Sequence, residues 1–304
     1  MPFRSYSSIE NSYNKKKVDE FVKLNDNIDW VATEKIHGTN FSIYKEVGTD
    51  SLTYCKRSGK IAGEENFYNY EVVVRRLEHI LKSTFKYIED NYSVLIGVQI
   101  FGELYGGNYL GEKCLGKPIQ KGVYYTNTND FKAFDIAVDY KFLDYLEFKK
   151  ISSITGLPIV PELRFGKLEE LLEMSPEFET EIYKEYGLPY IQDNISEGLV
   201  IKPVKEVDYK DRLILKIKSS RFSEIPRQRT ENNDLFDTIW TYINKNRVES
   251  VKSKNAEDIK HKNLVRLVVL DAIEEYEKLN SPINDKAIII SKLIGKLAKN
   301  KEYF

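Results

Sequence analysis

Cysteine is nearly absent from this chain of 304 residues, which contains only Cys55 and Cys114. The two cysteines are far apart in the sequence and belong to no C-x-x-C pattern, which argues against a disulfide framework and against a cysteine-based zinc site. This composition fits a reducing compartment.

An excess of charge of either sign is also missing. The chain has 46 Lys and Arg residues against 47 Asp and Glu residues, which gives a formal net charge of −1. No global positive field therefore attracts a nucleic acid, and any surface that binds one must be local.

Long apolar runs are absent as well. Residues 1–14 carry Ser, Tyr, Asn and Glu where a signal peptide has an apolar core, and no uninterrupted apolar stretch approaches transmembrane length. The sequence also lacks internal repeats and low-complexity tracts. We therefore expect a soluble, cytoplasmic monomer that makes no contact with membranes.

The chain has enough hydrophobic residues, 41% of the total, for one large or two ordinary domains. Short β-prone stretches dominate its middle, at residues 41–44, 52–55, 94–101, 123–125, 131–138, 199–203 and 213–217. Apolar residues recur at three-to-four spacing over residues 70–90 and 142–155, which predicts helices between the strands. The mixture predicts an α+β fold built from antiparallel sheets.

The pattern changes near Pro226. Three later stretches are typical of amphipathic helices, namely residues 234–244, 259–279 and 285–297. The polar and basic stretch 219–229 is typical of a linker or a phosphate-facing strip. We therefore predict one domain over residues 1–228 and a small all-α C-terminal domain over residues 229–304.

Six basic residues of the C-terminal region are candidates for gripping the backbone of a duplex: Arg247, Lys252, Lys254, Lys260, Lys262 and Arg266. The acidic residues Glu249, Glu257 and Asp258 are interspersed among them. An ordinary solvated surface is therefore an equally good interpretation.

Lys35 is the candidate nucleophile. It follows the apolar patch at residues 30–32 and precedes Phe41, with Gly38 close by, so we expect it on a turn between two strands. A lysine attacks phosphorus only as the neutral amine, and a reference pKa of about 10.4 makes that form scarce unless burial or nearby cations lower the pKa. Other basic groups should therefore surround Lys35.

Three downstream lysines are candidates for this basic surrounding: Lys202, Lys216 and Lys218. On a strand, the period of two places Lys216 and Lys218 on one face, while Leu215 and Ile217 pack into the core from the opposite face. Both lysines would then point into one site.

Taken singly, these features are more often structural. Alternating lysines such as Lys216 and Lys218 commonly mark the wet face of an ordinary strand. Glu103 and Glu197 could be turn or cap residues, and His37 could be a structural histidine with satisfied hydrogen bonds. Only their joint order distinguishes the two interpretations.

Six short motifs occur in an order that resembles one family. Residues 34–40, Glu-Lys-Ile-His-Gly-Thr-Asn, are similar to the first motif of the RNA ligase 2 group, Lys-x-His-Gly-x-Asn. This group belongs to the covalent nucleotidyltransferase superfamily of ATP-dependent ligases and includes the kinetoplastid RNA-editing ligases. DNA ligases and capping enzymes characteristically have Lys-x-Asp-Gly-x-Arg instead. The five later motifs follow in order at residues 56–59, 101–104, 133–136, 197–203 and 215–218.

The resemblance covers about residues 31–227 and implies a fold and a reaction. The fold is an ATP-grasp-like nucleotidyltransferase domain of antiparallel sheets with flanking helices, followed by a small helical domain. In the reaction, Lys35 attacks the α-phosphorus of ATP and retains AMP, while Lys216 and Lys218 act at the α-phosphate together with Mg²⁺, or alternatively Mn²⁺. The implied function is ATP-dependent sealing of 3′-OH and 5′-phosphate RNA ends, at nicks in duplex RNA, as in RNA repair.

The resemblance also implies a set of binding residues. Glu34 and the backbone of Ile36 would lie at the adenine edge, with Phe134 stacked on the ring. The complete nucleotide-binding set that it implies is Glu34, Ile36, His37, Asn40, Arg57, Glu103, Phe134 and Lys202, with Arg57 and Glu103 around the ribose. Glu197 is the implied metal ligand, because a hard oxygen donor suits magnesium.

Three alternatives remain open. The first is a ligase of the same superfamily that seals DNA or RNA joined to DNA. The second is a catalytically idle nucleic-acid-binding relative, against which the intact Lys35, Glu103 and Glu197 argue. The third is a capping guanylyltransferase, which His37 disfavours, as does the lack of the further strands that an OB-fold barrel would need.

Overall fold

The computed structural model describes residues 4–24, 28–63, 65–206, 212–224, 235–255, 259–280, 282–284, 286–300 and 303. The chain divides into two compact units, Met1–Ser219 and Ser220–Phe304. The domain boundary predicted between residues 228 and 229 lies outside the described residues, as does much of the predicted linker.

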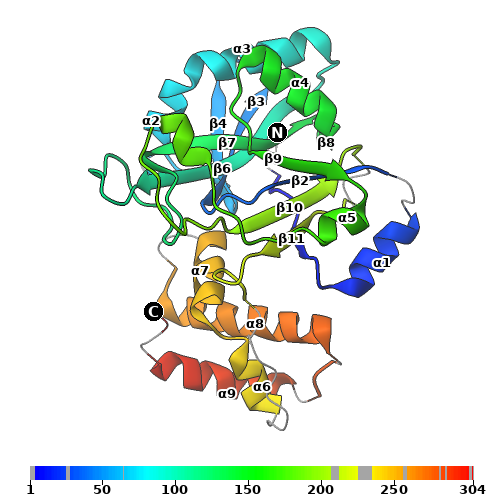
Figure 1. The fold of residues 1–304 in the computed structure, drawn as a ribbon, viewed down its shortest axis with the longest axis vertical. Coiled ribbons are helices and arrows are strands. Elements are labelled where there is room, and N and C mark those ends of the chain that lie inside the picture. Colours follow the sequence, from blue (N-terminus) through cyan, green and yellow to red (C-terminus); the bar gives the residue numbers. More distant parts are fainter. Residues whose placement is uncertain are drawn as a thin grey trace. The chain divides into compact units, whose positions relative to one another are not determined.

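The first unit contains a five-stranded sheet in the order β1-β11-β10-β2-β9 (Figure 1). Its strands are β1 (Glu10–Asn11), β2 (Trp30–Glu34), β9 (Glu162–Gly166), β10 (Gly198–Pro203) and β11 (Leu215–Lys218). Neighbouring strands are antiparallel, except that β1 pairs with β11 in parallel. Strand β2 ends just before Lys35, and β11 carries Lys216 and Lys218. Only β10 lies between these two strands in the sheet.

A six-stranded antiparallel sheet accompanies it, in the order β5-β4-β3-β6-β7-β8. Its strands are β3 (Thr39–Glu46), β4 (Leu52–Lys56), β5 (Gly59–Lys60), β6 (Gly97–Asn108), β7 (Thr126–Val138) and β8 (Lys141–Phe142). The chain passes directly from one sheet to the other through residues 35–38, so the turn that holds Lys35 joins the two sheets.

Helices cover the outer face of each sheet (Figure 1). Helices α2 (Tyr70–Arg76), α3 (Glu78–Asn91) and α4 (Tyr145–Thr155) share a hydrophobic core with the six-stranded sheet. Helices α1 (Lys15–Leu24) and α5 (Leu168–Leu172) share another with the five-stranded sheet, and a 3-10 helix, η1 (Ile182–Tyr186), precedes β10.

The apolar stripe of α3 shows why this packing is favourable. Leu81, Phe85 and Ile88 are at most 1% exposed and recur at helical spacing, so they form one buried face. Complete burial of such a side chain contributes about 1.5–3 kcal/mol.

The inner faces of the two sheets meet at a smaller apolar cluster of Tyr6, Phe101, Ala137 and Ile214. Phe101 and Ala137 come from the six-stranded sheet, and Ile214 immediately precedes β11. Phe134, Phe142 and Val200 pack against this cluster. Tyr6 of this cluster and two of the residues packed against it, Phe134 and Val200, also line the candidate site.

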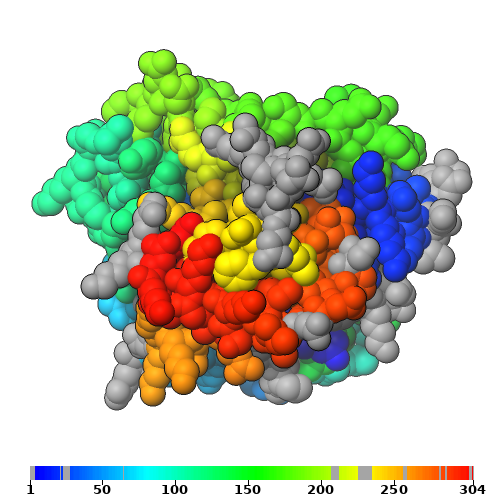
Figure 2. All heavy atoms as spheres, turned by 90° about the horizontal axis from the view of Figure 1, so that it is seen from below, coloured from blue at the N-terminus to red at the C-terminus, as the bar shows by residue number. Residues whose placement is uncertain are grey.

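The second unit is helical where it is described. Its helices are α6 (Leu235–Thr241), α7 (Lys245–Lys254), α8 (His261–Leu279) and α9 (Lys286–Lys299). Their apolar faces form a separate core that includes Val248, Val268 and Leu293. Figure 2 shows α6 (yellow), α8 (orange) and α9 (red) packed closely on one face of this unit.

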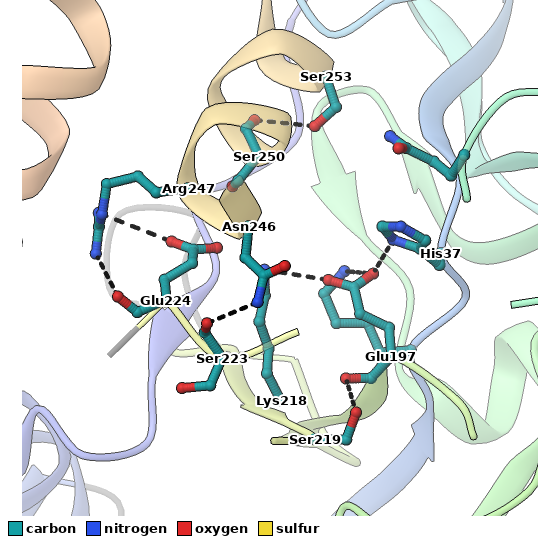
Figure 3. Close-up of polar contacts among 12 residues, drawn as sticks. His37, Glu197, Lys218, Ser219, Ser223, Glu224, Asn246, Arg247, Ser250 and Ser253 are labelled. Atoms are coloured by element: carbon teal, nitrogen blue, oxygen red, sulfur yellow. Dashed lines mark hydrogen bonds and ion pairs between the residues drawn. The ribbon is translucent and has the colours of Figure 1, made fainter. Parts of the chain in front are cut away.

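Arg247 corrects the prediction made for the C-terminal basic residues. Its side chain is 0% exposed and pairs with Asp271 and Glu224, and its Nε donates to the carbonyl of Tyr242 at 2.7 Å. Figure 3 shows Arg247 beside Glu224. Arg247 therefore stabilises the helical unit from within and does not grip a duplex.

The predicted α+β class, the antiparallel sheets and the C-terminal helices are confirmed. The predicted strand at residues 123–125 is wrong, and the single helix predicted over residues 70–90 is two helices that meet at Leu77. Helix α7 was not predicted. Among the residues that the structure describes, each helix is too short or too polar to span a lipid bilayer.

Candidate active site

Lys35 is the first residue after β2, on the turn expected from the sequence. Its backbone N–H donates to the carbonyl of Gly198 on β10 at 2.9 Å, and the N–H of Glu34 donates to the carbonyl of Pro161 at 2.9 Å. The turn is thereby held from both sides. The side chain of Lys35 is 19% exposed, so its amine is largely shielded from solvent but still accessible to a ligand.

Three cationic or basic side chains converge on the carboxylate of Glu197, and Figure 3 labels two of them, His37 and Lys218. The Nζ of Lys35 lies 2.8 Å and the Nδ1 of His37 lies 3.1 Å from Oε2, and the Nζ of Lys218 lies 3.2 Å from Oε1. Burial alone would raise the pKa of Glu197, but Lys35, Lys218 and His37 outweigh it and hold that pKa well below its usual range. Glu197 is therefore an ionised carboxylate.

The alternation of β11 is as predicted. Leu215 and Ile217 belong to the core of the five-stranded sheet or pack against it, so Lys216 and Lys218 share the opposite face. Lys218 is paired in register with Gly198. A Cβ at Gly198 would lie 2.0 Å from the carbonyl oxygen of Ile217, and its φ is 141°, so only glycine permits this approach.

A pocket of about 470 Å³ opens beside Lys35. Its lining comes from both sheets and the N-terminal segment: Tyr6, Ile9, Thr33, Glu34, Lys35, Ile36, Glu103, Phe134, Val160, Val200 and Lys202. Apolar walls with a few polar groups are typical of pockets for small ligands. Six of the predicted site residues line this one pocket.

Two carboxyl groups of the pocket behave differently from Glu197. Burial raises the pKa of Glu34 to about 7, although a hydrogen bond with Thr180 and the charge of Lys132 oppose the shift. Burial also raises the pKa of Glu103 to about 8, against the charges of Lys35 and Arg57. The pocket therefore contains carboxyl groups that are partly neutral near pH 7.

Glu34 has an oxygen available for a ligand. The side chain is 3% exposed, and its Oε1 is buried without a hydrogen-bond partner among the described residues. Buried polar atoms normally have a partner, so an unpartnered acceptor in a pocket wall suits a donor group on a bound molecule.

The remaining predicted residues lie around this arrangement. The ammonium of Lys202 lies 2.5 Å from Asp135 and 2.6 Å from the carbonyl oxygen of Phe134, so it braces the pocket wall. Asn40 is paired in register with Glu103, and Arg57 lies on the turn between β4 and β5. These last two are outside the lining of the pocket as the described residues form it.

Sequence reasoning missed a buried network behind Phe134. Asp135 pairs with Lys202 and with Arg212, whose Nη2 lies 2.8 Å away, and Arg212 also pairs with Glu206. The hydroxyl of Tyr6 donates to Asp135. Asp135 lies within the motif at residues 133–136, whereas Tyr6 and Arg212 carry no local pattern that could have identified them.

A family model described as RNA ligase matches residues 28–218, which contain all the predicted site residues. The chain belongs to the RNA ligase family. The matched range begins just before β2 and ends at Lys218, so the family match ends with β11.

Two curated members of the RNA ligase family are similar in sequence. Mitochondrial RNA-editing ligase 2 of Trypanosoma brucei brucei is 30% identical over 261 residues, which are 75% of this chain and 62% of that protein. Mitochondrial RNA-editing ligase 1 of Trypanosoma brucei brucei is 29% identical over 253 residues, which are 69% of this chain and 54% of that protein. The matches thus cover little more than half of these relatives.

Solved structures of Naegleria gruberi RNA ligase have a similar fold. A mutant with AMP and Mn and another with ATP and Mn each align with a TM-score of 0.52 at 16% identity, over 73% of this chain and 58% of theirs. At this identity the likeness concerns the fold alone. It shows that this chain shares its α+β fold with these RNA ligase structures.

Proposed function

We propose that this protein is an ATP-dependent RNA ligase that joins 3′-OH and 5′-phosphate ends through a lysyl-AMP intermediate, with nicked duplex RNA as its substrate. One observation carries the proposal. The amine of Lys35 lies at the wall of the Glu34 and Phe134 pocket and, at the same time, in contact with the carboxylate that pairs with Lys218. A nucleophile, a pocket with an aromatic wall and a cation for phosphate meet at one point.

The first step is attack of Lys35 Nζ on the α-phosphorus of ATP. The ammonium of Lys35 first gives up a proton to solvent, which frees the lone pair of Nζ and removes the charge that holds it 2.8 Å from Glu197. The neutral amine then attacks: a P–N bond forms, the P–O bond to pyrophosphate breaks, and a second proton leaves the nitrogen for solvent. Lys216 and Lys218 lie on one face of β11, from which their charges stabilise the transferring phosphoryl group.

The pocket suits adenine better than guanine. The unpartnered Oε1 of Glu34 can accept a hydrogen bond from the exocyclic amine of adenine, whereas guanine presents a carbonyl oxygen at that position. Phe134 offers a ring for stacking. Glu103 contributes a carboxyl group for the ribose hydroxyls.

The donor set fits a magnesium or manganese ion held mainly by substrate. Among the described residues no group of three or more acidic, His or Cys side chains could enclose a metal. Magnesium usually takes one or two carboxylates together with substrate phosphates and water, and the ionised Glu197 can supply one such carboxylate. When bound, the ion would neutralise negative charge on the phosphates.

The later steps would use the same pocket. AMP moves from Lys35 to the 5′-phosphate end, with formation of a P–O–P bond and release of the amine. The 3′-hydroxyl then attacks that 5′-phosphate and expels AMP, which closes the strand. The family and the names of the Trypanosoma brucei brucei relatives support RNA as the strand that is sealed.

Sealing of matched nicked duplexes tests this function. Purified protein with ATP and magnesium is expected to close a nick in duplex RNA, to act more slowly on the same nick in DNA, and to be inactive with GTP. Lys35→Ala should abolish closure, whereas Lys45→Ala, which removes a lysine paired with Glu89 far from the pocket, should not. Preferential sealing of DNA, or sealing with GTP, would contradict the proposal.

A further inference from the structure

The N-terminal segment crosses the back of the pocket and is fixed at three points. The guanidinium of Arg4 lies over the ring of Tyr140, 3.7 Å from its centroid, and its carbonyl accepts from Gln99 at 3.3 Å. Tyr6 lies in the apolar cluster between the sheets. Beyond it, β1 pairs with β11, and Asn11 is in register with Lys216.

Tyr6 sits at the centre of three aromatic contacts. Its ring centroid lies 4.7 Å from that of Phe134 in an edge-on arrangement, 5.3 Å from Phe101 and 5.7 Å from Phe142. Phe101 and Phe142 therefore hold Tyr6 against Phe134. Aromatic pairs at these distances have a preferred geometry, so the tilt of one ring restricts the tilt of the other.

The hydroxyl of Tyr6 gives the ring a second constraint. It donates to Asp135, the residue after Phe134, and accepts from Nη1 of Arg212 at 3.1 Å. Tyr6 is 5% exposed and Asp135 is 1% exposed, so these bonds are shielded from water. Tyr6 thus contacts the Phe134 ring through its own ring and, through its hydroxyl, the carboxylate of the next residue, Asp135.

We propose that Tyr6 is a positioning residue for nucleotide binding, which holds the Phe134 ring in the orientation that stacks on the adenine. This inference rests on the proposed function for the identity of the nucleotide. Phe134 is only half-buried, and its open side faces the pocket. Without Tyr6 behind it, the ring can turn into the vacated space, and the stacking surface is lost before ATP arrives.

A double-mutant cycle on Tyr6 and Phe134 tests the inference. Tyr6→Leu and Phe134→Leu are each expected to raise the KM for ATP in lysyl-AMP formation by about three- to tenfold, the worth of one aromatic contact, with kcat nearly unchanged. The double variant should resemble Phe134→Leu alone, because both changes remove one interaction. Tyr6→Phe should lower the melting temperature through loss of the buried hydrogen bond and leave KM unchanged.

Phe85→Leu is the control for lost stability, since Phe85 is 1% exposed in the core beneath α3 and away from the pocket. It should lower the melting temperature without raising KM. An increase in KM for the double variant equal to the product of the two single increases would overturn the inference, as would an equal increase in Phe85→Leu. If the wild type forms no lysyl-AMP, the proposed function fails separately, and the same cycle on the ATP dissociation constant by calorimetry decides the role of Tyr6.

Discussion

Three glutamates around Lys35 have the same chemistry but opposite charge preferences. Glu34 and Glu197 are buried and Glu103 is half-buried, and in all three burial penalises the ionised form. Glu197 differs because three cationic or basic side chains touch it, so its pKa falls while the other two rise. Neighbouring charge, and not burial, thus distinguishes Glu197, which contacts Lys35, from the two glutamates that line the pocket.

The raised pKa of Glu34 predicts a pH-dependent affinity for ATP. A carboxyl group with a pKa of about 7 is mostly neutral below pH 7, and only the ionised form accepts well from the adenine amine. We expect the KM for ATP to rise as the pH falls below about 7, by up to about tenfold per unit. Glu34→Gln should remove this dependence, and a flat wild-type profile between pH 5.5 and 8, which extends about 1.5 units below and about one unit above that pKa, would contradict the assignment.

Glu197→Gln tests the anchoring of the nucleophile. The amide keeps the size of the side chain but loses the charge that holds Lys35, His37 and Lys218 together. We expect the single-turnover rate of lysyl-AMP formation to fall by about 100-fold or more, as is usual when a positioned charged group is lost. Glu162→Gln, which weakens a pair with Lys149 outside the pocket, is the matched control. An unchanged rate in Glu197→Gln would mean that the cluster only stabilises the fold.

At the residue scale, the sequence was informative where chemistry demands a particular side chain in a short motif. Lys35, Glu103, Glu197 and Lys218 could be singled out in this way, and the structure brings them together. Tyr6 could not, because its role depends on contacts with residues far along the chain and its neighbours in sequence are unremarkable. Whether each residue has its predicted role in catalysis stays a prediction.

At the scale of elements, the approach of β10 to β11 decides where Lys218 points. Gly198 and Lys218 are partners in the ladder, and the ladder closes only because Gly198 has no Cβ. Glu197, the residue before it, then reaches the ammonium of Lys218. The geometry of one strand pair therefore sets the geometry of the cationic cluster.

Gly198→Ala should damage both stability and activity. Its Cβ would lie 2.0 Å from the carbonyl oxygen of Ile217, so β11 must move away and take Lys218 with it. Gly59→Ala is a matched control, since Gly59 has a similar φ of 147° but open space around it. We expect Gly59→Ala to cost about 1–2 kcal/mol of unfolding free energy from backbone strain alone, and Gly198→Ala to cost more and to slow lysyl-AMP formation. Denaturant unfolding measures both losses of unfolding free energy. Equal losses in Gly59→Ala and Gly198→Ala would contradict this explanation.

Elements were predictable where one periodicity dominates. The alternation at residues 215–218 and the stripe of α3 are local patterns, and both are found as expected. Residues 123–125 have strand-forming side chains, yet the backbone of Tyr124 forms its hydrogen bonds with the side chain of Asn194. The N–H of Tyr124 donates to Asn194 Oδ1 at 2.9 Å, and Asn194 Nδ2 donates to the carbonyl of Tyr124 at 2.7 Å. A side chain from a distant segment replaces the neighbouring strand, and no local pattern contains that information.

On the scale of the whole molecule, the chain has two units with separate cores, and all the predicted site residues lie in the first. The sequence revealed the change in texture from mixed to helical. It did not reveal that the helical unit contains a buried arginine, because no sequence pattern distinguishes Arg247 from the other basic residues of this region.

Arg247→Met tests whether the second unit depends on this arginine. Removing one partner of a buried pair usually costs about 3–5 kcal/mol, so the helical unit should unfold at a lower temperature. Lysyl-AMP formation should persist, because the pocket belongs entirely to the first unit. Calorimetry should show the lower-temperature transition in Arg247→Met and not in Lys252→Met, whose side chain is 38% exposed. Loss of lysyl-AMP formation in Arg247→Met would show that the units are coupled.

We expect Lys35 to carry AMP, and intact-protein mass spectrometry can detect this adduct. After incubation with ATP and magnesium, the protein should gain the mass of one adenylyl group, peptide mapping should place it on Lys35, and pyrophosphate should remove it. Lys35→Ala should gain no mass under the same conditions. An adduct on another residue, or none in wild-type protein first cleared with pyrophosphate, would contradict the account.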